Sequence, residues 1–195
     1  LIDFLPQNAE INLLDIATGT GDVLFAAAAR PKFIGKGFGI DISGNMLSQA
    51  REKCRAHSAE NLRFACGNAE RLAFPENTFD AVTIAFGVRN MRNMSQTLRE
   101  AWRVLRSGGK IAILEFSTPE KWCLKNLYFF YLRFIVRLLG GALSGHWQAY
   151  RYLQESIEQF PSRSRFCEVL KDNGFTHVQA YPLTGGIVTV YVGEK

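Results

Sequence analysis

The sequence is poor in the residues that build disulfide frameworks and metal sites. Its four cysteines and three histidines are scattered along 195 residues, without a C-x-x-C pair or a cluster of histidines. This pattern argues against a zinc site and a disulfide-stapled fold, and it indicates a reducing compartment. A signal peptide, an internal repeat, a low-complexity stretch and a linker are also missing. The sequence therefore predicts a single cytoplasmic domain over residues 1–195.

A large excess of charge is missing as well. The net charge is +5, and most of it lies in residues 119–152, where five basic residues accompany a single acid, Glu120. The rest of the chain is nearly neutral, so it lacks the clustered basic residues that are typical of a nucleic-acid-binding protein. The chain does not begin with Met and reaches its first apolar run almost at once. We therefore expect an N-terminal part of the protein to precede residue 1.

The main pattern in the chain is an apolar run that ends in an acid, which occurs twice: residues 13–22 read L-L-D-I-A-T-G-T-G-D, and residues 39–41 read G-I-D. Apolar runs alternate with amphipathic segments, which is typical of a parallel sheet with right-handed crossovers. Two final runs joined by T-G-G predict a hairpin. The fold class is thus α/β, a mostly parallel seven-stranded sheet with a C-terminal antiparallel hairpin. Strands are expected at 12–16, 37–41, 61–66, 79–86, 110–116, 177–183 and 187–193, and helices at 21–29, 43–57, 94–105 and 166–173.

The turn after the first strand favours one class of ligand. Gly19 and Gly21 let the backbone approach a ligand closely. Leu24 replaces the third glycine of the dinucleotide fingerprint, and Asp22 puts a carboxylate where a helix N-terminus would receive a phosphate. Both features weaken an NAD interpretation and favour a phosphate-free nucleoside with a cationic group, such as S-adenosylmethionine (SAM). The alternative is that the glycines only form a tight turn.

Further candidates follow other strands, whose carboxyl ends meet in one crevice in such a sheet. Asp41, 20 residues after Gly21, is placed to accept hydrogen bonds from ribose, with capping of the next helix as the alternative. Asn68 and Ala69 offer a side-chain oxygen and a backbone N–H for adenine, or else form an Asx-turn. Asp15 either holds the backbone N–H groups of the glycine turn or faces the amino group of the methionine part.

Arg89 lies in F-G-V-R-N, residues 86–90, directly after the fourth strand. Its guanidinium could stabilise a phenolate through charge-assisted hydrogen bonds, and the alternative is a structural salt bridge. An Asn/Asp-Pro-Pro-aromatic motif, frequent at this place in methyltransferases that act on nucleic-acid bases, is missing.

Residues 122–143 are rich in aromatics and leucines on one helical side and in bases on the other. Arg133 and Arg137 interrupt the segment too often for a membrane span. Two interpretations stay open: a helix that covers the core, or a basic amphipathic lid that meets a membrane surface or a lipophilic substrate. In either case the sequence predicts an amphipathic helical insertion at about 119–152.

Together these motifs resemble the ubiquinone/menaquinone C-methyltransferases, a branch of the SAM-dependent class I methyltransferases with a Rossmann-like fold. The resemblance runs from residue 13 nearly to the end of the chain. Motifs that are widespread among SAM enzymes occur at residues 15–22, at Asp41 with Met46 and Leu47, and at residues 68–70 with 74–80; residues 103–109 also match the family. The more specific stretches are F-G-V-R-N at 86–90, L-E-F-S at 114–117 and Y-R-Y-L-Q-E-S-I at 150–157.

The resemblance implies SAM as the cofactor and places several residues around it. Thr20, Asp41, Asn68 and Ala69 fall on positions that contact SAM in the family. Ala85 stands where the family often has Ser at a further cofactor contact.

The implied reaction is C-methylation of a reduced quinone with a polyprenyl tail, in respiratory quinone biosynthesis. Arg89 is expected to serve the developing oxyanion, and His146, Tyr150 and Tyr152 are candidates for the base or for orienting the substrate. Benzoquinol and naphthoquinol both stay open as substrates. The resemblance also leaves room for a homo-oligomer and for peripheral contact with the inner face of the membrane.

Two other functions stay open on the sequence. One is methylation of another lipophilic phenol or small molecule. The other is a SAM-binding module that is inactive without its N-terminal segment.

Overall fold

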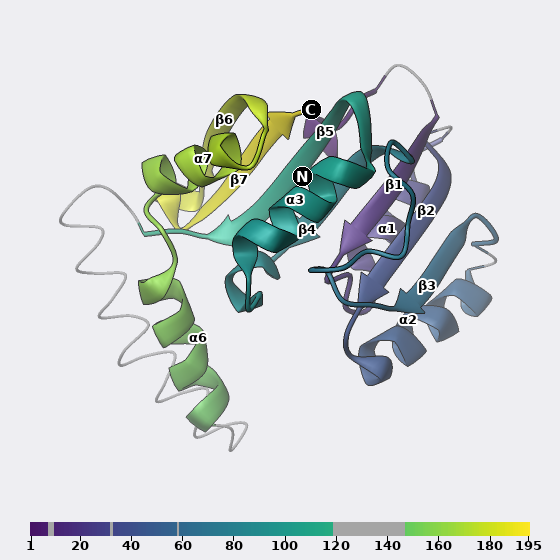
Figure 1. The fold of residues 1–195 in the computed structure, drawn as a ribbon. Coiled ribbons are helices and arrows are strands. Elements are labelled where there is room, and N and C mark those ends of the chain that lie inside the picture. Colours follow the sequence, from purple (N-terminus) through teal and green to yellow (C-terminus); the bar gives the residue numbers. More distant parts are fainter. Residues whose placement is uncertain (8–9, 32, 58, 119–146) are drawn as a thin grey trace.

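The computed structural model describes residues 1–7, 10–31, 33–57, 59–118 and 147–195. Their strands form one sheet in the order β3-β2-β1-β4-β5-β7-β6 (Figure 1). Neighbouring strands are parallel except around β7, which is antiparallel to both β5 and β6. The predicted seven-stranded α/β sheet with a closing hairpin is confirmed. The strands are β1 (Ile11–Ile16), β2 (Ile34–Asp41), β3 (Leu62–Cys66), β4 (Phe79–Ala85), β5 (Leu105–Phe116), β6 (Thr176–Leu183) and β7 (Val188–Glu194).

Helices cover both faces of the sheet. The helices α1 (Asp22–Ala28) and α2 (Gly44–Ala56) lie on one face, and α3 (Met94–Val104) and α7 (Arg163–Asp172) lie on the other (Figure 1). Both layers follow from the alternation of side chains along β1, where Leu13 packs with Leu24 of α1 and Leu14 packs into the cluster under α3 and α7. Among the described residues, a helix long and apolar enough to cross a membrane is not found.

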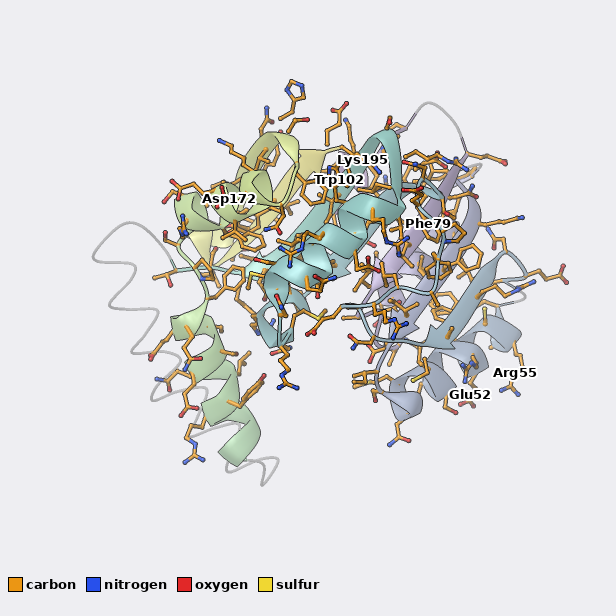
Figure 2. All side chains as sticks on the ribbon, in the orientation of Figure 1. Glu52, Arg55, Phe79, Trp102, Asp172 and Lys195 are labelled. Atoms are coloured by element: carbon orange, nitrogen blue, oxygen red, sulfur yellow. The ribbon has the colours of Figure 1, made fainter. Side chains whose placement is uncertain are left out.

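The amino ends of β4 and β5 are closed by the last residue of the chain. Lys195 donates hydrogen bonds to the Leu105 carbonyl at 2.7 Å and to Asn77 Oδ1 at 2.9 Å. Its ammonium lies 4.1 Å from the centre of the Trp102 ring, and Figure 2 shows these two side chains together at the end of α3. This edge of the sheet is therefore occupied by structural contacts, and the opposite edge is left for a ligand.

Three predicted elements begin earlier than expected, and the first is the strand expected at 37–41, which begins at Ile34. The helix expected at 166–173 begins earlier, at Arg163, because the Ser162 hydroxyl caps it by accepting a hydrogen bond from the Arg165 N–H. The strand expected at 110–116 already begins at Leu105, since the chain pairs with β4 from Phe79 onward. Of the insertion predicted at about 119–152, residues 119–146 lie outside the described residues, so the insertion stays a prediction; the helix α6 (Trp147–Gln159) begins inside this range and continues beyond residue 152.

Candidate functional site

The ends of β1 to β4 bring the predicted site residues to one edge of the sheet. The Thr18 N–H donates to the Ile40 carbonyl at 3.0 Å, and the Gly67 N–H donates to the Asp41 carbonyl at 3.0 Å. These bonds join the turns after β1, β2 and β3. The turn after β4 lies equally close, because a Cβ on Gly87 would meet the Ala17 Cβ at 2.6 Å. The turns thus form one continuous row along this edge, in the strand order β3-β2-β1-β4.

The turn after β1 has the backbone conformation that its glycines predict. Gly19 has φ +55° and Gly21 has φ +82°, in the left-handed region. A Cβ on Gly19 would meet nothing within 4 Å, whereas one on Gly21 would lie 2.8 Å from the Phe64 ring. Gly21 is therefore required by packing, and Gly19 faces open space where a ligand can approach.

The carboxylate of Asp41 joins two of these turns. Oδ2 accepts a hydrogen bond from the Gly19 N–H and Oδ1 accepts one from the Ser43 N–H, both at 2.8 Å. The cap of α2 is Ser43, whose hydroxyl accepts a hydrogen bond from the Met46 N–H. Capping of α2, the alternative considered for Asp41, therefore falls to Ser43. The next residue, Ile42, is 81% exposed and is an apolar surface beside the acid that sequence analysis missed.

Asp15 is buried at the end of β1 and is 1% exposed. Its carboxylate accepts hydrogen bonds at 2.6 Å from the Thr18 and Thr83 hydroxyls, so these hydroxyls take the place of the backbone N–H groups expected from the sequence. Burial raises the pKa of Asp15 to about 6, against the lowering effect of the two hydroxyls, and the charges of Asp41 and Asp22 add to the rise. A cation placed beside Asp15 would relieve this unfavourable burial.

The structure weakens one step of the sequence argument. Asp22 was expected to repel a phosphate, but its carboxylate pairs with Lys53 at 2.6 Å and accepts a hydrogen bond from the Thr20 hydroxyl at 2.9 Å. The Lys53 hydrogen bond, followed by that of Thr20, lowers the pKa of Asp22. The charge of Asp22 is therefore largely compensated, and Asp15 and Asp41 carry the negative potential of the turn.

Asn68 and Ala69 follow β3 and reach the same edge. The Asn68 side-chain oxygen accepts a hydrogen bond from the Glu70 N–H at 2.9 Å, which is the Asx-turn considered as an alternative. The exposed Asn68 side chain retains its amide donors at this edge. Ala69 is buried.

Arg89 makes the salt bridge that was considered as the alternative to an oxyanion role. It lies in η2 (Val88–Asn90), and its Nη1 donates to Glu115 Oε1 at 2.5 Å and to the Phe86 carbonyl at 2.8 Å. The Glu115 side chain is 0% exposed and that of Arg89 is 10% exposed. Burial raises the pKa of Glu115, and the Arg89 charge opposes this rise. No role for Glu115 was expected from the sequence, although an acid at the end of an apolar strand is a visible signal.

Aromatic rings lie beside this pair at the ends of β4 and β5. The Phe86 and Phe116 ring centres are 4.7 Å apart, and the Arg89 guanidinium lies 5.2 Å from the Phe116 ring centre. Phe86 is 37% exposed. Ala85, the predicted cofactor contact, is half-buried at the end of β4 and pairs with Leu114 of β5. Its methyl group offers no hydrogen bond, so any polar contact from this residue must come from its backbone.

The remaining catalytic candidates lie on or before α6. The Tyr152 hydroxyl donates to Asn90 Oδ1 at 3.0 Å and so ties α6 to η2. Leu153 and Ile157 of α6 pack with Phe116 and Ile187. His146 lies outside the described residues, and of Tyr150 only its place in α6 is described.

Within the described part of the chain, a group of three or more side chains able to hold a metal ion is not found.

The buried acid gives a pH-dependent prediction. The pKa of Asp15 is raised in the folded state, so its contribution to stability is full below its unfolded value, about 3.9, and is lost as pH rises through about 6. We expect Asp15→Asn to gain stability relative to the wild type by about 2–3 kcal/mol as pH rises from about 4 to about 7. Urea denaturation at several pH values measures this difference.

The control is Asp22→Asn, because the pKa of Asp22 is lowered. The difference in unfolding free energy between Asp22→Asn and the wild type should change with pH in the opposite direction, because folding favours the ionised form of Asp22. A stability difference between Asp15→Asn and the wild type that does not change with pH would contradict the assignment.

Known proteins resemble this chain along nearly its whole length. The ubiE/COQ5 methyltransferase family matches residues 2–195. The ubiquinone/menaquinone biosynthesis C-methyltransferase UbiE of Geotalea daltonii is 43% identical over 184 residues, which cover 94% of this chain and 78% of that protein. The demethylmenaquinone methyltransferase of Geobacillus stearothermophilus is 39% identical, over 93% of this chain and 78% of that protein.

Solved structures agree on the fold. A SAM-dependent methyltransferase from Aquifex aeolicus superposes with a TM-score of 0.69 at 19% identity, covering 96% of this chain and 84% of that one. The family match spans almost every residue described above, including the stretches that carried the resemblance in the sequence. The chain belongs to the ubiE/COQ5 methyltransferase family.

Proposed function

We propose that this methyltransferase uses SAM to methylate a ring carbon of a polyprenylated quinol. One observation carries the proposal: a buried acid and a half-buried acid, Asp15 and Asp41, border a glycine turn whose remaining acid, Asp22, is already paired. Such an edge suits a nucleoside with a positive charge and without phosphate. The relatives named for quinone methylation support the choice of substrate.

The residues at the edge fit the adenosine part of SAM. Each oxygen of Asp41 accepts one hydrogen bond and retains a second lone pair, so the carboxylate can also accept bonds from two ribose hydroxyls. Exposed Ile42 offers an apolar surface for the adenine ring, and Asn68 retains amide donors for its nitrogens. The space beside Gly19 is open. Thr20 and Ala69 border the same turns.

SAM supplies an electrophilic methyl group on a positively charged sulfur. The chain's part is to hold that charge near the buried Asp15, and to hold an aromatic ring in line with the methyl group. Phe86 and Phe116 offer a surface for stacking the quinol ring at the ends of β4 and β5. Water is kept away by the same rings.

Carbon methylation needs an electron-rich ring carbon. The quinol hydroxyl loses a proton, and the carbon beside it forms the new bond to the methyl group as the methyl–sulfur bond breaks, which leaves S-adenosylhomocysteine. That carbon then loses its own proton, and the ring becomes aromatic again. We assign to Arg89 the stabilisation of the phenolate oxygen, since it lies at the end of β4 next to the two rings. His146, Tyr150 and Tyr152 remain candidates for receiving a proton.

The polyprenyl tail accounts for the apolar and basic character of residues 122–143. We infer that this segment meets the tail and an anionic membrane surface, and that the enzyme works in the cytoplasm at the inner face of the membrane. Lys121, Lys125, Arg133 and Arg137, in or next to this segment, supply the positive charge that an anionic surface attracts.

The function is tested by its product. The protein is incubated with SAM carrying a deuterated methyl group and with demethylmenaquinol or the corresponding benzoquinol, and the quinones are analysed by mass spectrometry. We expect the labelled methyl group on the quinone ring with one ring hydrogen lost. A labelled methyl group on an oxygen would contradict the proposal, and so would the absence of label from both quinols.

The ribose contact of Asp41 can be separated from its structural bonds. We expect S-adenosylhomocysteine to bind about 10–100-fold more tightly than its 2′,3′-dideoxy analogue, because hydrogen bonds to a charged acceptor would be lost. In Asp41→Asn, which keeps one neutral acceptor oxygen, the ratio of the two affinities should fall below about tenfold. Calorimetry measures both affinities, and Asp22→Asn is the control that should keep the wild-type ratio. An unchanged ratio in Asp41→Asn would exclude the ribose contact.

If Arg89 stabilises the phenolate oxygen, its loss should lower turnover and leave the affinity for SAM nearly unchanged. Arg89→Ala should lower kcat by about 10²–10³-fold, as for loss of an oxyanion donor, and should change the Kd for SAM less than about twofold. Arg92→Ala, a change at an exposed neighbour, serves as the matched control. A normal kcat in Arg89→Ala would exclude this role.

A further inference from the structure

Glu115 is a buried acid that the proposed reaction has not used. It lies near the end of β5 with a fully buried side chain. Oε1 accepts hydrogen bonds from Arg89 Nη1 at 2.5 Å and from the Phe116 N–H at 2.8 Å, and Oε2 accepts one from the Arg89 N–H at 3.3 Å. One carboxylate therefore holds both the main chain and the side chain of Arg89.

Stability alone does not account for this pair. Removing two charges from water costs more than their attraction regains in many buried pairs, so an apolar pair of similar size can be as stable or more stable. Buried ionisable groups of this kind concentrate at functional sites. The location fits that rule, since the pair lies beside Phe86 and Phe116, at the edge where the other site residues gather.

Direct contact of Glu115 with a substrate is excluded by its burial. With 0% of its side chain exposed, Glu115 is out of reach of a bound quinol and cannot receive a proton from it directly. Any effect on the reaction must therefore pass through Arg89. The Arg89 guanidinium is fixed on three sides, by Glu115, the Phe86 carbonyl and the Phe116 ring. Its Nε is buried without a hydrogen-bond partner among the described residues.

We propose that Glu115 is the positioning residue for Arg89, fixing the orientation of the guanidinium toward the reacting oxygen. This inference rests on the proposed function, because it assumes that Arg89 acts on the quinol. The carboxylate also neutralises most of the Arg89 charge. Arg89 then acts as a fixed hydrogen-bond donor, since an oriented dipole stabilises developing charge without having to rearrange.

A double-mutant cycle tests the proposal. Glu115→Gln should lower kcat by about tenfold and change the Kd for SAM less than about twofold. In the Arg89→Ala background, Glu115→Gln should have no further effect on kcat, because its only route to the reaction is gone. Independent effects that multiply would overturn the proposal, and so would wild-type kcat in Glu115→Gln.

Glu100→Gln is the matched control, because Glu100 forms a comparable pair with Arg103 on α3, at 2.7 Å, in a part of the fold without a proposed role in the reaction. It should retain kcat within about twofold. Should Glu115→Gln fold poorly, the double variant keeps the proposal falsifiable, because it removes both buried charges together and a kcat below that of Arg89→Ala would overturn the proposal.

Chemical rescue gives an independent measurement. Millimolar guanidinium chloride should restore part of the activity of Arg89→Ala, because the Glu115 carboxylate can hold the free cation in the vacated place, and it should not restore the double variant. Equal rescue of both variants would overturn the positioning role. Absence of quinol turnover by the wild type would instead overturn the proposed function itself, together with the role of Arg89 on which this inference rests.

Discussion

The bridge that Asp41 makes between Gly19 and Ser43 is the constraint on which the site depends. It holds the turn after β1 against the start of α2 and places a carboxylate at the mouth of the glycine turn. Because the same oxygens can each accept a second hydrogen bond, a ribose could bind without breaking the bridge. The acid therefore shapes the turn and marks the class of ligand that the turn can take.

The two fully buried acids divide the site into halves of different electrostatic character. Asp15 is held by the Thr18 and Thr83 hydroxyls and gains from a nearby cation. Glu115 is held by Arg89 and is already compensated. One half of the edge thus favours a positive ligand, and the other presents fixed donors and aromatic rings. That division matches a reaction between a cationic methyl donor and an electron-rich ring.

The fold was predictable because periodicity marks each strand and because parallel strands bring their carboxyl ends to one edge. The same logic brought Asp15, Asp41, Asn68 and Arg89 to that edge, as the structure has them. The partners of these residues were not predictable. Thr83 looks like an ordinary strand residue, and Glu115, although an acid at the end of an apolar strand, carries no sign of its partner. Only the register of β4 against β1 pairs Thr83 with Asp15, and only the path of η2 pairs Glu115 with Arg89. Helix boundaries failed where a single hydroxyl, that of Ser162, decided them.

A crystal structure of the protein with S-adenosylhomocysteine would test the central claim most directly. The account predicts both ribose hydroxyls within hydrogen-bond distance of the Asp41 carboxylate, with Gly19 N–H and Ser43 N–H still bound to it, and the adenine ring against Ile42. A ligand whose ribose lies away from Asp41, or a diphosphate bound at the glycine turn in crystals soaked with a dinucleotide, would contradict it.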